Sequence, residues 1–409
     1  METNNIKYKV INTVSSYVEK LISDFRGGTI EREQYTDVLL FCAEIFDISF
    51  LKVFEDDLKN IIVNILDAIK SEIYSGKKDD LYFIGMQQSV GSIAFSLRLL
   101  NKKGMNVIQF QKYFDGLIAE YYYTHIDLYY QKPVAPIFYD SIYGLSGMLN
   151  YCLDYCLEQK EVIEGVMKYL VSLTEINDRN VIRYFIMELP RYATEETESV
   201  PYLDFGMAHG MMSPLLVLSK AREIGFRVEG IDSAIQILRE HYREYELQSK
   251  EGTLKYPTQL SLEAYYSKYV DRCSFNNGWC YGNGSIVFGL MRVARACGDG
   301  KEFLYYKDNL WKIMSRDIRE SGFFEPIVCH GYASVLLLQM CVYLETKEEK
   351  FLTDLETNLI ATLKCHEEFL GKESYIKNYS LLEGAAGVIL ALLKAMGETI
   401  ESSRLLLLE

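Results

Sequence analysis

Apolar residues recur at three- and four-residue steps through most of this chain. The segments "VIEGVMKYLVSL" (162–173) and "LLLQMCVYLE" (336–345) are typical, each with an apolar stripe bordered by polar positions. This period is that of an amphipathic helix. The whole chain contains seven prolines, most of them between such segments, so the helical pattern is rarely interrupted. The pattern predicts an all-α fold.

Short glycine-bearing turns open many of the apolar segments. They recur about every 50 to 75 residues, which is room for a pair of helices in each repeat. One helix of each pair is apolar and rich in small residues, and the other is longer and more charged. We therefore predict a single α/α toroid domain over residues 1–409, in which an outer ring of helices covers an inner ring, with glycines where backbones converge. The turns are "IGMQQSVGSIAFSL", "IYGLSGMLNYCL", "DFGMAHGMMSPLLVL", "CYGNGSIVFGLM", "CHGYASVLLL" and "LEGAAGVILALL", with a copy that lacks glycines at "EQYTDVLLFCAEIF".

One interval departs from this pattern. Residues 172–205 lack a clean helical period, and "NVIRYFIMEL" within them alternates in a way that suits a strand. We predict a small inserted subdomain with β-structure over this interval.

Composition narrows the function. The formal net charge is −14, which argues against a nucleic-acid groove, because such a groove needs a basic stripe. The N-terminus has scattered charges and no apolar core of signal-peptide length, and no stretch is apolar enough to span a bilayer, so we expect a cytoplasmic protein. Nine cysteines, an odd number at irregular spacing, predict reduced thiols rather than a disulfide framework.

Two of the glycine turns carry metal-binding residue types. Cys280 lies in "NNGWCYGNG", and Cys329 and His330 lie side by side in "VCHGY". Thiolates with one imidazole are ligands that zinc prefers, and three protein ligands leave a fourth position open, as in catalytic zinc sites. A lone buried cysteine is usually a small core residue, and this alternative stays open for Cys280 taken alone. Cys273 is a further candidate for a fourth ligand. The pair Cys365–His366 lies mid-helix among charges without a glycine turn, so we do not expect it to bind metal.

Two further candidates lie at other turns of the repeat. His209 is in "GMAHGMMS", and Asp140 lies just before "YGLSG". A carboxylate near an imidazole can orient it and raise its pKa, which would make an acid–base pair. The alternative is that Asp140 caps a helix and His209 is a core imidazole. The spacing alone does not decide between these interpretations.

The motifs "YGLSG", "MAHG", "WCYGNG" and "VCHGY", in this order along the chain, resemble those of the lanthionine synthetase C-like family, the lantibiotic cyclases. The resemblance is greatest to free-standing bacterial cyclases of the nisin-cyclase type and runs from roughly residue 80 to 395. It implies a toroid of seven helix pairs with a small SH2-like α+β insertion. It also implies one Zn²⁺ held by Cys280, Cys329 and His330, with His209 and Asp140 as the catalytic pair. Trp279 and Tyr281 match aromatic positions beside the first zinc cysteine, and we count Tyr281 among the candidate catalytic residues.

The implied reaction is an intramolecular Michael-type addition. A cysteine thiol of a dehydrated peptide attacks dehydroalanine or dehydrobutyrine, and a (methyl)lanthionine thioether ring forms. The implied partners are the precursor peptide with its leader, and a dehydratase and an exporter in a modification complex, which would place the protein peripherally at the inner membrane face. The chain departs from the family pattern at Asn276, where an arginine is usual, and at Asn277, where an acidic residue is usual. Arg272 is a candidate for the missing cation.

Other functions remain open at this point. The chain could be a non-catalytic docking subunit that binds leader peptide and dehydratase around a structural zinc. It could also be a glutathione-binding relative, although such proteins usually have histidine where Tyr281 stands. A toroidal glycosidase would need paired acidic residues at the inner turns, where this chain has cysteines and histidines.

Overall fold

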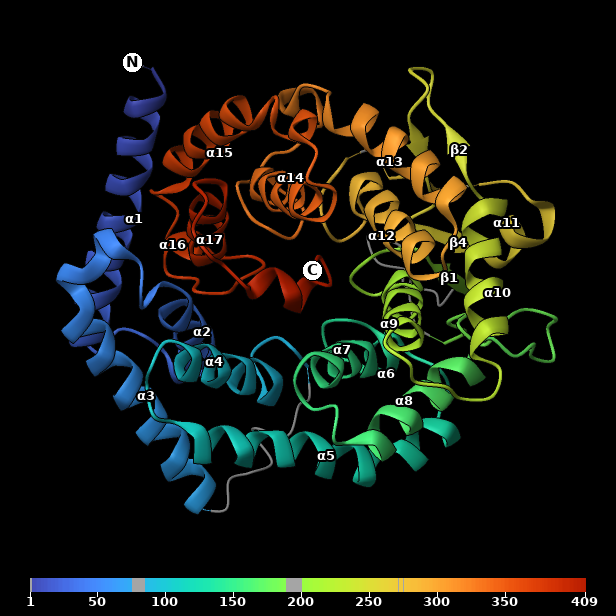
Figure 1. Cartoon of the computed structure of the whole chain (residues 1–409), viewed down its shortest axis with the longest axis horizontal. Coiled ribbons are helices and arrows are strands. Elements are labelled where there is room, and N and C mark those ends of the chain that lie inside the picture. The colour runs from blue at the N-terminus through green and yellow to red at the C-terminus, as the bar shows by residue number, and fades with distance from the viewer. Residues whose placement is uncertain (1, 76–84, 189–200, 271, 275) are drawn as a thin grey trace. The chain divides into compact units, whose positions relative to one another are not determined.

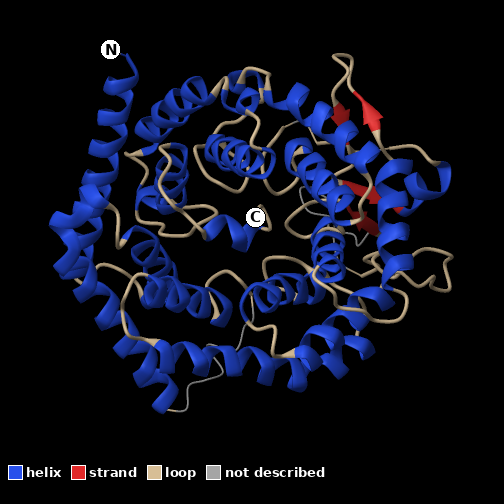
Figure 2. Ribbon diagram, viewed as in Figure 1, coloured by secondary structure: helices blue, strands red, loops and turns tan. Residues whose placement is uncertain are grey.

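Helices make up most of the structure, a computed structural model that describes residues 2–75, 85–188, 201–270, 272–274 and 276–409 (Figures 1 and 2). The chain divides into two compact units. Unit 1 contains Met1–Ile118 and Phe323–Arg404, and unit 2 contains Ala119–Gly322 and Leu405–Glu409. The long helix α5 (Ile108–Gln131) runs through the boundary between them. Our prediction of a single toroid domain stays a prediction.

Unit 1 contains four helices that are buried on nearly all sides. In α2, ten of the eleven residues are buried, although its segment has no glycine. Helix α2 packs on α4 and α17, and α17 packs on α14. Because small and apolar residues cover every face of these helices, each can be enclosed by neighbours. The four helices are α2 (Tyr35–Ile45), α4 (Val90–Lys102), α14 (Tyr332–Thr346) and α17 (Ala385–Ala395).

The other long helices of unit 1 bury one face each. In α3 the buried residues are Leu58, Ile61, Ile62, Ile65, Leu66 and Ile69, which follow the three- and four-residue steps of the sequence pattern. Helices α1, α3 and α15 pack on α17, α2 and α14, respectively. The one-sided helices are α1 (Glu2–Arg26), α3 (Glu55–Tyr74) and α15 (Leu355–Phe369); the short elements are η1 (Arg32–Gln34), η2 (Ser49–Phe54), η5 (Glu349–Leu352), α16 (Glu373–Ile376) and η6 (Ser402–Leu406).

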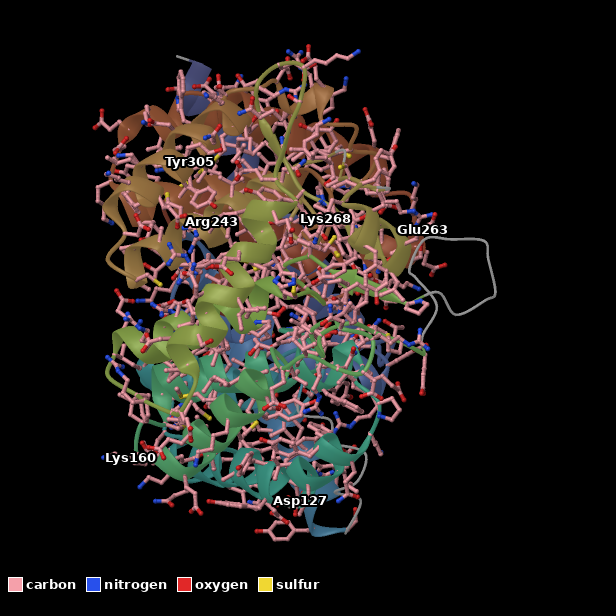
Figure 3. All side chains as sticks on the ribbon, turned by 90° about the vertical axis from the view of Figure 1, so that its right-hand side faces the viewer. Asp127, Lys160, Arg243, Glu263, Lys268 and Tyr305 are labelled. Carbon is pink, nitrogen blue, oxygen red and sulfur yellow. The ribbon has the colours of Figure 1, made fainter. Side chains whose placement is uncertain are left out.

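Unit 2 repeats the arrangement of buried and one-sided helices. Its buried helices α7, α9 and α12 pack on one another in that order, and α8, α10 and α13 pack on α7, α9 and α12. Arg239 and Arg243 of α10 form ion pairs with Glu302 of α13, on the surface where Arg243 is labelled in Figure 3. The elements are α6 (Pro136–Tyr139), α7 (Leu145–Tyr155), α8 (Lys160–Ser172), α9 (Met212–Glu223), α10 (Ile231–Glu244), α11 (Leu262–Ser267), α12 (Asn283–Ala296), α13 (Gly300–Met314) and η4 (Ile318–Glu320).

The predicted apolar segments all form these buried helices, and four of the helices have a glycine at the N-cap. The N-caps of α7, α12, α14 and α17 are Gly144, Gly282, Gly331 and Gly384. At each glycine a Cβ would lie 1.9–2.4 Å from a backbone atom four to six residues earlier in the same turn. We expected these glycines where backbones of different repeats converge, but the close approach is within each turn. The glycine therefore lets the turn fold back onto the helix that it opens.

Over the described residues, the β-structure is small and lies in unit 2 (Figure 2). Strand β1 (Tyr202–Asp204) pairs antiparallel with β4 (Gln259–Ser261), in the register Leu203 with Leu260. Strands β2 (Leu247–Gln248) and β3 (Leu254–Lys255) form a hairpin.

The predicted strand at "NVIRYFIMEL" does not form over its described part, where Ile182 and Ile186 make only isolated bridges. Part of the predicted insertion, 189–200, lies outside the described residues, so the boundaries 172–205 stay a prediction. The partner of β1 is more than fifty residues further along the chain, outside that interval.

Among the helices of the described part of the chain, none combines the length and the apolar character that a membrane crossing requires.

Candidate active site and metal centre

Asp140 organises the turn that leads into α7. Its carboxylate is fully buried, and one oxygen, Oδ1, accepts hydrogen bonds from the backbone N–H groups of Ile142 (3.0 Å), Tyr143 (2.6 Å) and Gly144 (2.8 Å). These donors belong to the turn that precedes α7, since the helix begins at Leu145 and its N-cap is Gly144. The alternative that Asp140 caps the helix is therefore wrong: this oxygen binds the backbone of the preceding turn.

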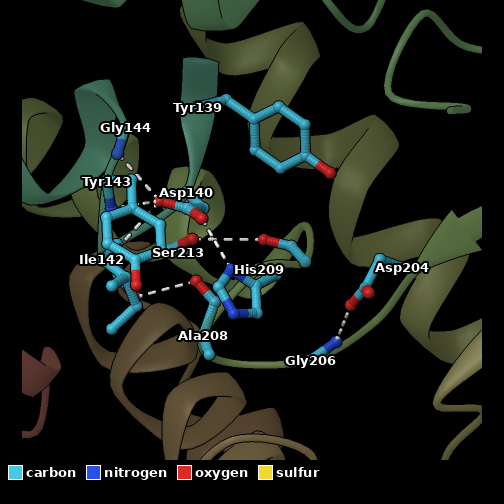
Figure 4. Close-up of polar contacts among 12 residues, drawn as sticks. Tyr139, Asp140, Ile142, Tyr143, Gly144, Asp204, Gly206, Ala208, His209 and Ser213 are labelled. Atoms are coloured by element: carbon cyan, nitrogen blue, oxygen red, sulfur yellow. Dashed lines mark hydrogen bonds and ion pairs between the residues drawn. The ribbon is translucent and has the colours of Figure 1, made fainter. Parts of the chain in front are cut away.

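The second carboxylate oxygen of Asp140 binds His209 (Figure 4). Oδ2 lies 2.6 Å from Nδ1 of His209, which is in the turn before α9. An ionised carboxylate only accepts hydrogen bonds, so Nδ1 carries the proton in this contact. This assignment leaves Nε2 as the ring nitrogen that can exchange a proton with a substrate. Asp140 thus binds the turn before α7 through one oxygen and orients the imidazole through the other.

The surroundings of His209 favour its charged form. Burial alone would lower the pKa of the imidazole. The hydrogen bond and charge of Asp140, together with the charges of Asp204 and Cys280, outweigh this effect and raise the pKa above its ordinary value. A quarter of the side chain is exposed, so a substrate can reach the ring. An imidazole that holds its proton near neutral pH is suited to act as a general acid or base.

The turn of His209 lies directly against the turn of Cys280. The backbone N–H groups of Met207 and Ala208 donate to the carbonyl of Cys280 at 2.8 and 3.4 Å. The carbonyl of Ala208 in turn accepts from the hydroxyl of Ser141 at 3.0 Å. These contacts connect three turns, those of Asp140, His209 and Cys280, within unit 2. A candidate acid–base pair and one candidate metal ligand are therefore held by neighbouring backbone.

Tyr281 contacts a carboxylate that sequence reasoning missed. Its hydroxyl donates to Oδ2 of Asp204 at 2.9 Å, and Asp204 is fully buried at the end of β1. Burial raises the pKa of Asp204, and the donors around it, Gly206 among them, act in the opposite direction. A sequence signal existed. Asp204 stands two residues before Gly206 in "DFGMAHG", much as Asp140 stands before Gly144.

Cys329 and His330 occupy the turn before α14 in unit 1. The N–H of Cys329 donates to the carbonyl of Leu382 at 2.9 Å, which fixes the cysteine backbone. Nε2 of His330 lies 3.4 Å from Oε2 of Glu325, another residue that sequence reasoning missed. Side chains of metal-binding histidines commonly donate their second N–H to a carboxylate. Nε2 faces Glu325, so Nδ1 is the nitrogen that we expect to face a metal.

Cys280, Cys329 and His330 form a group that could bind a metal ion, and it is the one such His/Cys/Asp/Glu group found within the described residues. Two thiols and one imidazole fit zinc by donor type. Cys273 is not a member of the group. The fit therefore uses three protein ligands, the number that leaves a coordination position open to a substrate.

The pair Cys365–His366 has no part in that group. Both residues are buried in α15, and Nδ1 of His366 lies 2.5 Å from the hydroxyl of Tyr375. Burial lowers the pKa of His366 to about 4 and raises that of Cys365 to about 11. The imidazole of His366 is a buried, neutral core group.

The supporting residues have mainly structural contacts. Trp279 is 2% exposed, and its indole N–H donates to the carbonyl of Leu406 at 2.9 Å. Oδ1 of Asn276 accepts from the N–H of Gly278 at 3.1 Å, which shapes the turn before Cys280. The backbone carbonyl of Arg272 accepts from the N–H of Thr258 at 3.2 Å. The role of Arg272 as a substitute cation stays a prediction.

A cleft in unit 1 adjoins His330. Its volume is about 320 Å³, and its lining includes Glu325, Lys372, Tyr375 and Glu383 beside the imidazole. His330 therefore borders a cleft whose lining includes several polar and charged side chains.

Comparison with known proteins relates the chain to one family of proteins. The family model described as "Lanthionine synthetase C-like protein" matches residues 38–408. The nisin biosynthesis protein NisC of Lactococcus lactis subsp. lactis is 26% identical over 400 residues, with 92% of this chain and 90% of NisC covered. The solved structure of a nisin cyclase shares the fold with a TM-score of 0.82 at 23% identity, over 99% of this chain and 98% of that one. The predicted resemblance and the mostly helical fold with small sheets are confirmed.

Proposed function

Because the chain belongs to the lanthionine synthetase C-like family, we propose that it is a zinc-dependent cyclase that closes thioether rings in a dehydrated peptide. The reaction adds a cysteine thiol to dehydroalanine or dehydrobutyrine and yields lanthionine or methyllanthionine. The observation that carries the proposal is the pair Asp140–His209, held on backbone that is hydrogen-bonded to Cys280. This reaction needs a thiol site and a proton carrier next to each other.

The proposed metal ligands are Cys280, Cys329 and His330, with one Zn²⁺ per chain. A zinc ion bound there would lower the pKa of a substrate thiol that approached it. Glu325 would hold His330 by its Nε2, and the N–H of Cys329 would remain fixed on Leu382. These contacts keep the donor atoms of the turn in place before substrate arrives.

His209 and Asp140 would handle the protons. The thiol loses its proton, the sulfur bonds to the β-carbon, and the electrons of the carbon–carbon double bond move to form an enolate. The enolate then receives a proton at the α-carbon, so no other reactant is consumed. Nε2 of His209 is suited to either transfer because Nδ1 is held by Asp140. Tyr281 would stand beside the same turn, and Asn276 and Trp279 would shape the backbone that carries Cys280.

The proposed partners follow from the same function. The substrate would be a dehydrated precursor peptide with its leader, and the proposed context is a modification complex with a dehydratase and an exporter. A flexible peptide suits the acidic surface, which does not suit a nucleic acid.

The experiment uses purified protein and a leader-bearing peptide with one dehydroalanine and one cysteine. Ring closure leaves the mass unchanged but removes the free thiol, so N-ethylmaleimide labels only the open peptide. We expect wild-type protein and Cys365→Ala to protect the thiol, and Cys329→Ala to lose both zinc and protection. If the wild type retains zinc but closes the ring no faster than the peptide does without protein, the chain is not a cyclase. That result would favour the non-catalytic docking subunit.

A further inference from the structure

Asp204 is a buried carboxylate to which three donors point. Its Oδ1 accepts from the N–H of Gly206 at 2.8 Å, and its Oδ2 accepts from Nε2 of Gln259 at 3.1 Å and from the hydroxyl of Tyr281 at 2.9 Å. Figure 4 shows Asp204 with Gly206 on the chain segment that continues to His209. Gln259 is paired with Asp204 across the two strands β1 and β4, so its amide is held in register. A carboxylate with three donors is a satisfied buried group.

The turn that carries His209 is built around this carboxylate. The carbonyl of Asp204 accepts from the N–H of Met211 at 2.9 Å, which closes the turn. A Cβ at Gly210 would lie 2.5 Å from Oδ1 of Asp204, and a Cβ at Gly206 would lie 2.7 Å from ring atoms of Tyr281. Both glycines are therefore needed for the close approach of the turn to these two side chains.

The hydrogen bond also limits what Tyr281 can do. A phenol has one proton, and here it is donated to Asp204. The phenol oxygen can still accept a hydrogen bond. Asp204 therefore sets the direction of the Tyr281 hydroxyl.

We propose that Asp204 is a positioning residue of this active site: it holds Tyr281 through the phenol and His209 through the turn between β1 and α9. This inference rests on the proposed function. Asp204 would not contact the substrate itself but would act through Tyr281 and His209. Through this contact Asp204 sets the place and direction of the Tyr281 hydroxyl. The strand pair β1–β4 supports the site through Gln259.

The test compares the wild type, Asp204→Asn, Tyr281→Phe and the double variant. The matched control is Asp37→Asn, which changes another buried carboxylate that accepts from an amide, Nε2 of Gln88, at 2.8 Å in unit 1. Zinc per chain, circular dichroism, melting temperature, and kcat and KM for ring closure are measured on each. In Asp204→Asn the amide nitrogen can donate to the phenol, so Tyr281 loses the acceptor that fixes its proton.

We expect Asp204→Asn to lower kcat by about 10- to 100-fold, with zinc content and KM changed by less than about twofold. Tyr281→Phe should lower kcat in the wild-type background and add less than about a further twofold in Asp204→Asn, because the two residues act together. Asp37→Asn should leave kcat unchanged. A kcat of Asp204→Asn within twofold of wild type, or losses that multiply in the double variant, would overturn the inference.

Two further outcomes are decisive. If Asp204→Asn does not fold, Tyr281→Phe alone decides, since an unchanged kcat in that variant overturns a role that acts through the phenol. If the wild type closes no ring, the proposed function is overturned. The melting temperatures of the two single variants and the double variant then show whether Asp204 and Tyr281 act together. Additive shifts in the double variant would overturn the inference, and non-additive shifts would support it.

Discussion

Asp140 and His209 are 69 positions apart in the chain, and Oδ2 of one lies 2.6 Å from Nδ1 of the other. Each residue lies at the turn before a buried helix, α7 or α9, and these two helices pack against each other. The glycine turns therefore bring chemically active side chains from distant segments to one place within unit 2. The same turns fix the backbone, through the three N–H groups that bind Oδ1 of Asp140.

Replacement of Asp140 by Asn should preserve the turn and impair the histidine. The amide oxygen can still accept the backbone N–H groups, but the negative charge that raises the pKa of His209 is lost. The limb of the pH–rate profile that belongs to His209 should therefore shift to lower pH, and kcat should fall by about 10²- to 10⁴-fold. Rates of ring closure from pH 5 to 9 measure both effects. His125→Asn is the control, and a profile of Asp140→Asn that matches the wild type would exclude this role.

Replacement of Glu325 by Gln should weaken zinc binding. The carboxylate lies 3.4 Å from Nε2 of His330, and loss of such a partner lowers metal affinity by about 10- to 100-fold. Competition with a coloured chelator measures the affinity without any substrate. Glu383→Gln is a matched control because Glu383 lines the same cleft. Equal affinities for both variants would show that the contact with Glu325 does not orient the ligand.

Replacement of Gly331 by Ala should distort the turn of Cys329 and His330. The added Cβ would lie 2.2 Å from the carbonyl oxygen of Glu325 and 2.7 Å from the nitrogen of Ile327, so backbone must move. We expect a loss of about 1–3 kcal/mol in unfolding free energy together with weaker zinc retention. Thermal unfolding and metal analysis measure these. Gly116→Ala, with no heavy atom within 4 Å of the added Cβ, should be neutral or stabilising. A Gly331→Ala protein as stable as Gly116→Ala would contradict the close approach.

Acid should destabilise unit 1 through His366. Burial lowers the folded-state pKa of this imidazole to about 4, below the ordinary value of 6.5. The unfolded chain then binds the extra proton between these pH values, so stability is complete above about pH 6.5 and falls by up to about 3 kcal/mol as the pH falls to about 4. His366→Asn keeps an acceptor for Tyr375 and should flatten the melting temperature over that window. An unchanged slope would assign the acid sensitivity to other groups.

The helical part of the fold could be predicted because its signal is local. Each buried helix has a continuous apolar segment. Four of these helices follow a glycine N-cap, which the tight turn before the helix requires. The strand pair β1–β4 could not be predicted in the same way. Its strands have three residues each, and the partner of Leu203 is Leu260, so neither strand shows a period of its own. The strand expected at "NVIRYFIMEL" was wrong because alternation over so few residues is weak evidence.

The site could be predicted in part for a similar reason. Turn position identified Asp140 and His209, but the sequence did not decide whether Asp140 was a helix cap or the partner of His209, and the contact of Oδ2 with Nδ1 shows that it is the partner. Asp204 and Glu325 were missed because their importance lies in what they contact: Asp204 accepts from Tyr281 of another turn, and Glu325 lies 3.4 Å from His330 of its own turn. The position of Asp204 before Gly206 was a sequence signal for its place at a turn, but not for its contact with Tyr281.

The last residues of the chain belong to unit 2. Leu405, Leu406, Leu407 and Leu408 are buried, and the carbonyls of Leu406 and Leu407 accept from Trp279 at 2.9 Å and from Arg292 at 2.6 Å. These residues are synthesised after the whole of unit 1, whereas the rest of unit 2 is synthesised before Phe323. Unit 2 therefore completes its core only after unit 1 has been made, and the indole next to Cys280 gains its partner last.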